Sequence, residues 1–444
     1  MSLGLFTDLY ELTMLRAYWE LGLEEEAVFS LFVRRLPAER NFLVACGVVD
    51  LLRELETFRF DGDDLAYLAS QGFPQPMLER LEDFRFEGDV YALPEGTPFF
   101  ANEPIVEVVA PIAQAQVIET LVLNQIGFQT IVASKAARIV EAAQGRSVID
   151  FGGRRAHGLD AAVKAARAAY VAGAVATSNV LAGRTYGIPV AGTMAHSFVQ
   201  AYAHEAEAFR SFAEIFPETV LLVDTYDTLG GVRKVIALAQ ELGGAFKVRA
   251  IRLDSGDLLA LSREARALLD AAGLASVDIF ASGGLNEDRI AKLVASGAPI
   301  DGFGVGTDLV VSTDAPALDI VYKLTEYGGK GRLKLSTDKR TLPGRKQVFR
   351  RFSGGVMTRD VIGRHDEALP GAPLLTQVMR QGASMAPSET LDDIQTRCRK
   401  EIAGLPAALR ELAPAEPPFA VEVSAALSEL EREVARTVAG NREP

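Results

Sequence analysis

Three residues that could do chemistry stand close together in the segment IRLDSGD, at the end of a short apolar run. Arg252 could grip a carboxylate through two parallel hydrogen bonds. Asp254 and Asp257 could hold ribose hydroxyls, or Mg²⁺ through water. A structural alternative is that Asp254 or Ser255 caps a following helix, with Asp257 in its first turn. Both readings can hold at once, and Arg252 carries the more specific prediction.

A histidine follows another apolar run in the segment GTMAHSF. His196 is one of only four histidines in the chain. A neutral imidazole at the end of a strand can act as a base, a metal ligand or an acceptor of a phosphoryl group. A single histidine is more often a structural group, so the role of His196 depends on its neighbours.

Glycine-rich turns and two aromatic residues complete the candidate chemistry. The turns ASGGLNEDRI and GFGVGTDL can place backbone N–H groups around a phosphate, helped by a following helix N-terminus. One such turn would be a weak signal, but the two together predict phosphate binding. Phe151 and Tyr10 lie beside polar turns and could stack on a flat ring, with core packing as the alternative for each.

The elements that must position these residues alternate between short apolar runs and helix-like stretches from about residue 147 to 322. Strict alternation of this kind indicates a parallel sheet. A barrel is favoured over a doubly wound sheet, because no early G-x-G-x-x-G turn is present and the strand count approaches eight. Seven strands are predicted, ending at Phe151, Ser178, Thr193, Thr225, Asp254, Gly284 and Thr307.

The polar and glycine residues follow these strands directly, and the carboxyl ends of parallel strands are where such folds place their ligands. One mouth of the barrel is therefore expected to collect the reactive groups. The predicted domains are an N-terminal α+β domain over residues 1–110, completed by 330–370, a barrel over 111–329, and a C-terminal helical extension over 371–444.

Composition excludes several classes of protein. The net charge of −13 argues against a general nucleic-acid binder. Residues 330–351 nevertheless carry nine cations and one acid, Asp338. This segment could bind a small polyanion, or it could be a solvated hairpin that is basic by chance.

The cysteines and the apolar segments indicate where in the cell the protein is expected. Cys46 and Cys398 stand far apart without zinc-site spacing, which argues against disulfides and a cysteine-bound metal. No segment approaches the roughly 18 apolar residues of a membrane span, and the first residues lack the pattern of a signal peptide. We therefore expect a cytoplasmic protein that does not bind membranes.

A series of motifs between about residues 5 and 352 resembles, in order, the nicotinate phosphoribosyltransferase family. The most specific are GTMAHSF, RLDSGD and PGRKQ, and the last ninety residues add little. The full set is TDLYELTM, FVRRLP, DFGGRRAHG, ATSNVLAG, GTMAHSF, VDTYDT, IRLDSGDL, FASGGLNE, GFGVGT and KLSTDKRTLPGRKQVFR.

The resemblance implies a type II phosphoribosyltransferase fold, an irregular α/β barrel with a second α+β domain. It implies a homodimer with shared sites, in which Tyr10 of one subunit helps to close the site of the other. Phe151 and Tyr10 would sandwich the pyridine ring of nicotinate, Arg252 would meet its carboxylate, and Thr193 would line the same pocket. Ser178 stands where nicotinamide-using relatives have an Asp, which favours nicotinate.

The resemblance also implies how the other substrates bind. Arg154 would lie near the phosphates, and the 5-phosphate of phosphoribosyl pyrophosphate would contact Gly283, Gly284, Gly304, Gly306 and Thr307. His196 matches a histidine that ATP phosphorylates to drive the transfer, and Mg²⁺ would be required. No zinc is expected, because Cys398 stands alone where some relatives have a cysteine-rich knuckle. The alternatives are a nicotinamide or quinolinate phosphoribosyltransferase, or a barrel protein that binds without catalysis.

Overall fold

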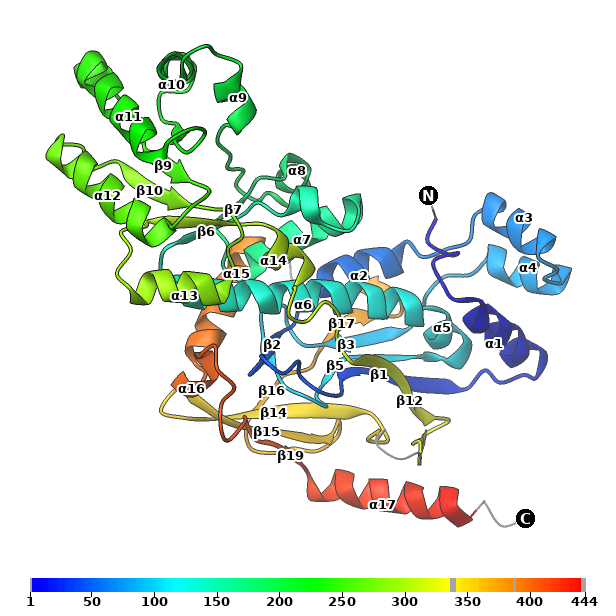
Figure 1. Cartoon of the computed structure of the whole chain (residues 1–444). Coiled ribbons are helices and arrows are strands. Elements are labelled where there is room, and N and C mark those ends of the chain that lie inside the picture. The colour runs from blue at the N-terminus through cyan, green and yellow to red at the C-terminus, as the bar shows by residue number, and fades with distance from the viewer. Residues whose placement is uncertain (1, 336–340, 386–388, 441–444) are drawn as a thin grey trace. The chain divides into compact units, whose positions relative to one another are not determined.

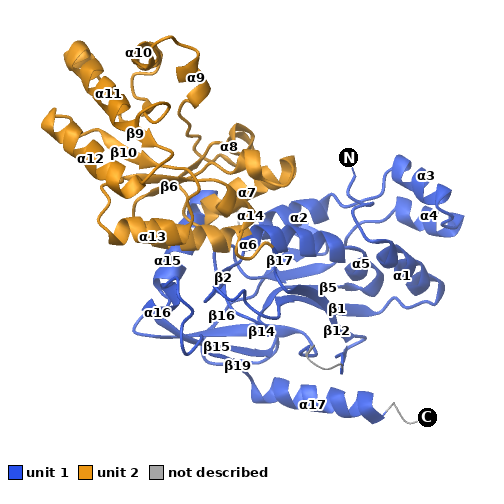
Figure 2. Cartoon of the chain, in the orientation of Figure 1, with its two compact units in different colours: residues 1–131, 317–444 blue, residues 132–316 orange. Residues whose placement is uncertain are grey.

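The computed structural model describes residues 2–335, 341–385 and 389–440, and these form two compact units (Figure 2). Unit 1 contains residues 1–131 and 317–444, and unit 2 contains residues 132–316. The chain therefore divides after residues 131 and 316, whereas the sequence placed the boundaries after 110 and 329. Helix α6 (Glu119–Ala143) runs through the first division.

Unit 1 contains a seven-stranded antiparallel sheet whose order is β13-β12-β1-β5-β3-β17-β18. A four-stranded sheet has the order β16-β14-β15-β19, and β2 pairs with β4. The strands are β1 (Glu26–Val33), β2 (Leu43–Val44), β3 (Asp89–Ala92), β4 (Pro98–Phe99), β5 (Pro104–Pro111), β12 (Ile320–Tyr327), β13 (Lys330–Gly331), β14 (Lys346–Ser353), β15 (Val356–Arg364), β16 (Ala372–Pro373), β17 (Thr376–Arg380), β18 (Ala383–Ser384) and β19 (Val421–Val423).

The predicted α+β domain is confirmed, and the C-terminal region is helical but not only helical. Its strand β17 extends the large sheet beside β3, and β19 extends the smaller sheet beside β15. The helices of unit 1, apart from α6, are α1 (Leu9–Glu20), α2 (Val48–Glu56), α3 (Gly62–Ser70), α4 (Gln75–Glu82), α5 (Ile112–Val117), α15 (Leu391–Ala403), α16 (Ala407–Arg410) and α17 (Ala425–Gly440).

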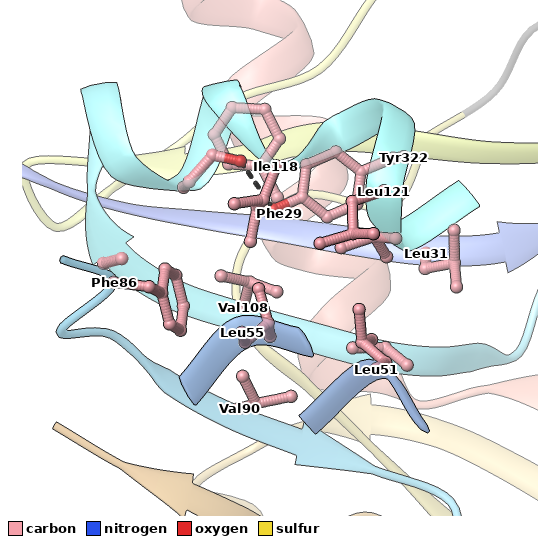
Figure 3. Close-up of a cluster of buried hydrophobic side chains, with 14 of the residues drawn as sticks. Phe29, Leu31, Leu51, Leu55, Phe86, Val90, Val108, Ile118, Leu121 and Tyr322 are labelled. Carbon is pink, nitrogen blue, oxygen red and sulfur yellow. Dashed lines mark hydrogen bonds between the residues drawn. The ribbon is translucent and has the colours of Figure 1, made fainter. Parts of the chain in front are cut away.

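The core of unit 1 lies between the large sheet and its helices (Figure 3). Phe29 of β1 stacks on Tyr322 of β12, with ring centres 4.8 Å apart. The buried Tyr322 hydroxyl donates to the carbonyl oxygen of Ala115 at 2.9 Å, so burying this ring leaves no unpaired hydroxyl. Leu51 and Leu55 of α2 contribute to the same cluster.

Two cations of the basic segment over residues 330–351 are buried in ion pairs. Lys346 is buried and pairs with Glu107 at 3.1 Å, and Arg350 is buried against Asp360 at 2.6 Å. Strand β14 forms a hairpin with β15 rather than with the start of the segment. These two cations therefore form buried ion pairs inside unit 1. Lys339 and Arg340 lie outside the described residues.

Unit 2 is built on a six-stranded parallel sheet with the order β7-β6-β11-β10-β9-β8 (Figure 1). Neighbouring strands follow one another in the chain, and β11 returns to pair with β6, as in a barrel. The predicted α/β barrel is thus confirmed in an incomplete form. The strands are β6 (Ser147–Asp150), β7 (Ala176–Thr177), β8 (Val220–Leu222), β9 (Ala250–Leu253), β10 (Asp278–Ala281) and β11 (Gly302–Val305).

The third predicted strand, ending at Thr193, does not form. Its only ladder contact in the described structure is one parallel bridge from Val190 to Thr177. Pro189 has no N–H to donate, and Gly192 adds no side chain to pack, so the segment cannot extend the ladder. The ring of strands therefore opens between this segment and β8.

The helices of unit 2 cover this sheet, and several start at a polar residue just after a strand. Asn179 caps α8, Asp227 caps α11, Asp257 caps α12 and Asn286 caps α13, each accepting a backbone N–H in the first turn. The helices are α7 (Leu159–Val171), α8 (Val180–Tyr186), α9 (His196–Gln200), α10 (Glu205–Ile215), α11 (Thr228–Leu242), α12 (Leu258–Ala271), α13 (Glu287–Ala295) and α14 (Thr307–Val311), with short 3-10 turns at Gly153–Arg155 and Gly243–Ala245. None of the helices described has the length and apolarity needed to cross a membrane.

Candidate active site

Arg252, Thr193 and Phe151 come together at the carboxyl ends of the parallel strands of unit 2. Arg252 lies in β9, and its Nη1 donates a hydrogen bond to Oγ1 of Thr193. The guanidinium carbon of Arg252 is 6.0 Å from the centre of the Phe151 ring, which directly follows β6. A cation, a hydroxyl and an aromatic face thus border one region, a combination that suits a flat anionic ring.

The Arg252 guanidinium is half-buried, and its Nε has no hydrogen-bond partner in the structure. Burial lowers the pKa of Arg252, and the positive charge of Arg154 lowers it further, while Asp254 and Asp224 act in the opposite direction. The exposed Arg154, in the turn after β6, therefore lies near enough for its charge to be felt. Two cations at this end of the sheet favour the arrival of an anion.

Asp150, the last residue of β6, is buried and fixes the turn on which Phe151 and Arg154 stand. Its two carboxylate oxygens accept from the Gly152 N–H and the Thr177 hydroxyl, both at 2.7 Å. Burial raises the pKa of this carboxyl, and these two hydrogen bonds oppose the rise. The N–H of Ser178 donates to the carbonyl oxygen of Asp150 at 2.8 Å, which holds the exposed Ser178 at the end of β7.

His196 lies where the ring of strands opens. Its Nδ1 is 3.2 Å from the hydroxyl oxygen of Thr225, which follows β8. Its Nε2 is 4.0 Å from Oδ2 of Asp254, and both side chains are partly exposed. The imidazole is thus oriented from one side by a hydroxyl and presents its other nitrogen toward a carboxylate.

Asp254 and Asp257 have different roles in the fold. Asp257 Oδ1 accepts from the N–H groups of Leu259 and Ala260, so the helix cap is Asp257 and neither Asp254 nor Ser255. Asp254 is instead held by Ser282, whose hydroxyl donates to its Oδ1. Its second oxygen faces His196 and remains available to a ligand.

Asp224 ties the end of β8 to the end of β9. Its Oδ2 accepts from the Asp254 N–H at 2.9 Å and from the Ser255 hydroxyl at 2.6 Å. Its Oδ1 is buried and has no hydrogen-bond partner. Groups of three or more His, Cys, Asp or Glu side chains able to hold a metal by themselves are absent from the residues that the structure describes.

The first glycine turn, after β10, packs directly on the Asp254 backbone. Gly283 and Gly284 have φ angles of +88° and +58°. A Cβ on Gly283 would come within 1.8 Å of the Asp254 carbonyl oxygen, so no larger residue fits. Arg289 of α13 donates to the Gly284 carbonyl oxygen at 2.6 Å, which leaves the N–H side of the turn to other partners.

In the second glycine turn, Gly304 lies inside a strand and Gly306 lies after it. Gly304 is buried inside β11, where a Cβ would come within 2.4 Å of the Phe151 ring. Gly304 therefore leaves space for the ring of Phe151. Gly306 and the exposed Thr307 follow the strand, at the start of α14, where a phosphate could approach.

Tyr10 belongs to unit 1, whereas the other predicted site residues belong to unit 2. It lies on α1 with 46% of its surface exposed, beside Leu9 at 67%. Partial burial and the charge of Glu119 raise the pKa of its hydroxyl, so the phenol stays protonated at neutral pH.

Sequence reasoning missed several residues of this region. Thr225 orients His196, Ser282 holds Asp254, and Phe280 of β10 lies beside Phe151 with ring centres 6.2 Å apart. Ser282 directly follows an apolar run and Thr225 stands one residue beyond another, so their position was the available signal. Phe280 reads as an ordinary core residue, and nothing local distinguishes it.

Most of the chain is similar in sequence to known proteins. Residues 5–127 match the nicotinate phosphoribosyltransferase N-terminal domain, and residues 146–342 match the nicotinate phosphoribosyltransferase family. The nicotinate phosphoribosyltransferase pncB2 of Mycobacterium tuberculosis is 56% identical over 411 residues, covering 92% of this chain and 89% of that protein. The nicotinate phosphoribosyltransferase of Bacillus subtilis is 48% identical over 358 residues, covering 79% and 73% respectively.

Solved structures show the same architecture. Human nicotinic acid phosphoribosyltransferase superposes with a TM-score of 0.87 at 29% identity, covering 96% of this chain and 99% of that one. A nicotinate-nucleotide pyrophosphorylase from Pyrococcus furiosus superposes with a TM-score of 0.75 at 26% identity, covering 90% and 95%.

Proposed function

This chain belongs to the nicotinate phosphoribosyltransferase family, and from that membership we propose that it forms nicotinate mononucleotide from nicotinate and phosphoribosyl pyrophosphate. The observation that carries the choice of acceptor is the position of Arg252 beside Phe151 and Thr193. The product is a pyridine nucleotide, so the reaction serves NAD biosynthesis.

The carboxylate of nicotinate would pair with Arg252 and the neighbouring Thr193 hydroxyl. A desolvated guanidinium prefers an anionic partner, which would also offer an acceptor to its buried Nε. Phe151 would cover one face of the ring. Ser178 is neutral and exposed, so it adds no negative charge against the carboxylate.

The transfer itself breaks the bond from the anomeric carbon to a pyrophosphate oxygen, and the lone pair of the ring nitrogen forms the new C–N bond. Pyrophosphate leaves with the bonding electron pair. The residues of this chain act by positioning both reactants and by stabilising charge. Arg154 would meet the phosphates, and the glycine turns with Thr307 would hold the 5-phosphate.

Mg²⁺ would neutralise the charge of the departing pyrophosphate. The donors fit this ion, because Mg²⁺ prefers oxygen and commonly binds through one or two carboxylates plus substrate phosphates. Asp254 and the buried, unpartnered Oδ1 of Asp224 suit it better than Asp257, whose Oδ1 is used in capping α12.

We further propose that ATP drives the transfer through His196. If the Nδ1–H donates to Thr225, the lone pair of Nε2 attacks the γ-phosphorus of ATP, and ADP leaves. Water then takes the phosphoryl group and releases inorganic phosphate. Asp254 would stabilise the positive charge that the ring gains when Nε2 bonds to phosphorus while Nδ1 keeps its proton.

The active enzyme would be a homodimer in which Tyr10 of one subunit closes the site of the other. The exposed Leu9 and Tyr10 on α1 suit an interface better than open solvent. Sedimentation would measure the assembly, and a Tyr10→Ala variant that remains dimeric should have a raised KM for nicotinate.

The deciding experiment measures product formation from nicotinate, nicotinamide and quinolinate, each with phosphoribosyl pyrophosphate and Mg²⁺, with and without ATP. Selective turnover of nicotinate, accelerated by ATP, supports the proposal. Preferred turnover of nicotinamide would contradict the role given to Arg252, and preferred turnover of quinolinate would contradict the choice of nicotinate as the acceptor. Turnover of none of the three would leave a barrel that binds without catalysing this transfer.

A further inference from the structure

We propose that Lys135 is a positioning residue that holds the two glycine turns in register for binding phosphoribosyl pyrophosphate. This inference rests on the proposed function, because it concerns the same phosphate-binding turns. Lys135 lies on α6, outside the motifs that carry the chemistry. It is buried, with 2% of its side chain exposed.

Lys135 contacts two carboxylates that come from different segments of unit 2. Its Nζ lies 2.6 Å from Oε2 of Glu287 and 2.7 Å from Oδ1 of Asp314. Arg138, three residues further along α6 and so on the same face of the helix, reaches Oε1 of Glu287 at 3.0 Å. Two cations and two carboxylates thus form one network with no net charge.

Each carboxylate belongs to a segment that continues from a glycine turn. Glu287 is the first residue of α13, and the cap of that helix, Asn286, ends the turn that begins at Gly283. Asp314 lies in the turn that follows α14, the helix that starts at Thr307 after Gly306. One ammonium group therefore ties together the segments that carry both turns.

The side chains of this network are largely buried. Side-chain exposure is 3% for Glu287, 9% for Arg138 and 26% for Asp314. A buried carboxylate without its cation would carry an uncompensated charge, so the segment would have to move toward solvent. The pKa of Glu287 is consistent with this: burial would raise it, but the charge of Lys135 brings it below its usual value.

The test compares Lys135→Met with the wild-type enzyme. Met keeps the length of the side chain and removes the charge. We expect the KM for phosphoribosyl pyrophosphate to rise about tenfold, because displacing binding groups by a fraction of an ångström is costly even far from the chemistry. The KM for nicotinate should stay within about twofold, since Arg252 lies on β9 and Phe151 follows β6, and neither belongs to a glycine turn.

A matched control is Lys234→Met, which breaks the 2.7 Å pair between Lys234 and the buried Glu205 in the same unit. That pair joins α10 to α11 and touches neither glycine turn. Its KM for phosphoribosyl pyrophosphate should equal that of the wild type. A merely structural role for Lys135 would reduce the amount of active enzyme while leaving both KM values unchanged, and that result would overturn the proposal.

Two further measurements keep the test decisive. Asp314→Asn leaves the Lys135–Glu287 pair in place and should raise the same KM about threefold, even if Lys135→Met does not fold. Calorimetric titration with Mg²⁺ and phosphoribosyl pyrophosphate, without a pyridine, measures binding directly. If wild type binds this donor and Lys135→Met binds it tenfold more weakly while nicotinate is not used, the inference stands and the proposed acceptor is wrong. If wild type does not bind phosphoribosyl pyrophosphate, the inference about Lys135 and the proposed function are both wrong.

Discussion

The carbonyl oxygen of Asp254 occupies the space that a side chain on Gly283 would need, since a Cβ there would lie 1.8 Å from it. This contact locks the first glycine turn to the loop that carries Asp254. The Ser282 hydroxyl strengthens the same link by donating to Asp254 Oδ1. The phosphate turn and the loop beside His196 are therefore one structural element, and a change in either should affect both.

Gly283→Ala should weaken both stability and donor binding. The positive φ alone costs an alanine about 1 kcal/mol, and the clash with the backbone should add roughly 1–3 kcal/mol. Gly297→Ala is the control, because Gly297 has a φ of +67° but a Cβ there would meet nothing within 4 Å. Urea unfolding measures the difference, and equal losses for both variants would mean that the contact with Asp254 yields easily.

Arg252→Gln should raise the KM for nicotinate about 100-fold. Losing charge-assisted hydrogen bonds to a carboxylate costs roughly 2–3 kcal/mol in a desolvated site. Steady-state kinetics with nicotinate and nicotinamide would show the preference for the acid disappearing. The exposed Arg249, which pairs with Glu218 just before β9, supplies the control Arg249→Gln, whose KM should not change. If the KM for nicotinate changes little in Arg252→Gln, the carboxylate of nicotinate binds to another residue.

Thr225→Val should reduce the acceleration by ATP. Without the hydroxyl, Nδ1 loses the partner that sets the tautomer of His196, so Nε2 carries its lone pair less often. We expect the ratio of rates with and without ATP to fall about tenfold, and to fall to one in His196→Ala. Acid-labile incorporation of label from γ-labelled ATP would measure the phosphohistidine directly. Undiminished labelling in His196→Ala would assign the phosphoryl acceptor to another residue.

Glu287 predicts a specific dependence of stability on pH. Burial would raise its pKa, but Lys135 lowers it below the ordinary value of 4.5. A carboxylate whose folded pKa lies below its unfolded pKa contributes stability that is complete above the unfolded value and lost as the pH falls through the folded one. Glu287→Gln should therefore cost roughly 3 kcal/mol at pH 7, and less as the pH falls below 4.5.

Thermal unfolding of wild type and Glu287→Gln from pH 7 to pH 3 would check this. The exposed pair of Glu218 with Arg249 provides the control, because Glu218→Gln should change stability little at any pH. A gap between wild type and Glu287→Gln that stays constant down to pH 3 would show that the carboxylate is not stabilised by the buried cations.

The parallel sheet and the polar residues at its carboxyl edge could be predicted from sequence because both depend on local patterns. Apolar runs followed by glycine or polar residues mark strand ends, and six of the seven predicted strands form. The exception ends at Thr193, where Pro189 prevents a regular ladder. The same local signal placed Arg252 and the glycine turns at strand ends, whereas His196 follows the predicted strand that does not form.

Other assignments depended on contacts that no local pattern encodes. Whether Asp254 or Asp257 caps α12 is decided by backbone geometry, which gives the cap to Asp257 and leaves Asp254 beside His196. Lys346 and Arg350 stand in a basic segment, yet the packing of unit 1 buries both against carboxylates. Charge composition alone could not separate these cations from a surface patch.

The sequence by itself determined the family, the alternation of strands and helices, and the residue types at the strand ends, because these follow from motifs and short-range periodicity. Only the tertiary structure decided which groups meet. Arg138 and Glu287 are 149 residues apart in the chain and 3.0 Å apart in space, and His196 meets Thr225 where the strand ring fails to close. Such contacts arise when distant segments pack together, so the physical information that specifies them is spread over the whole unit.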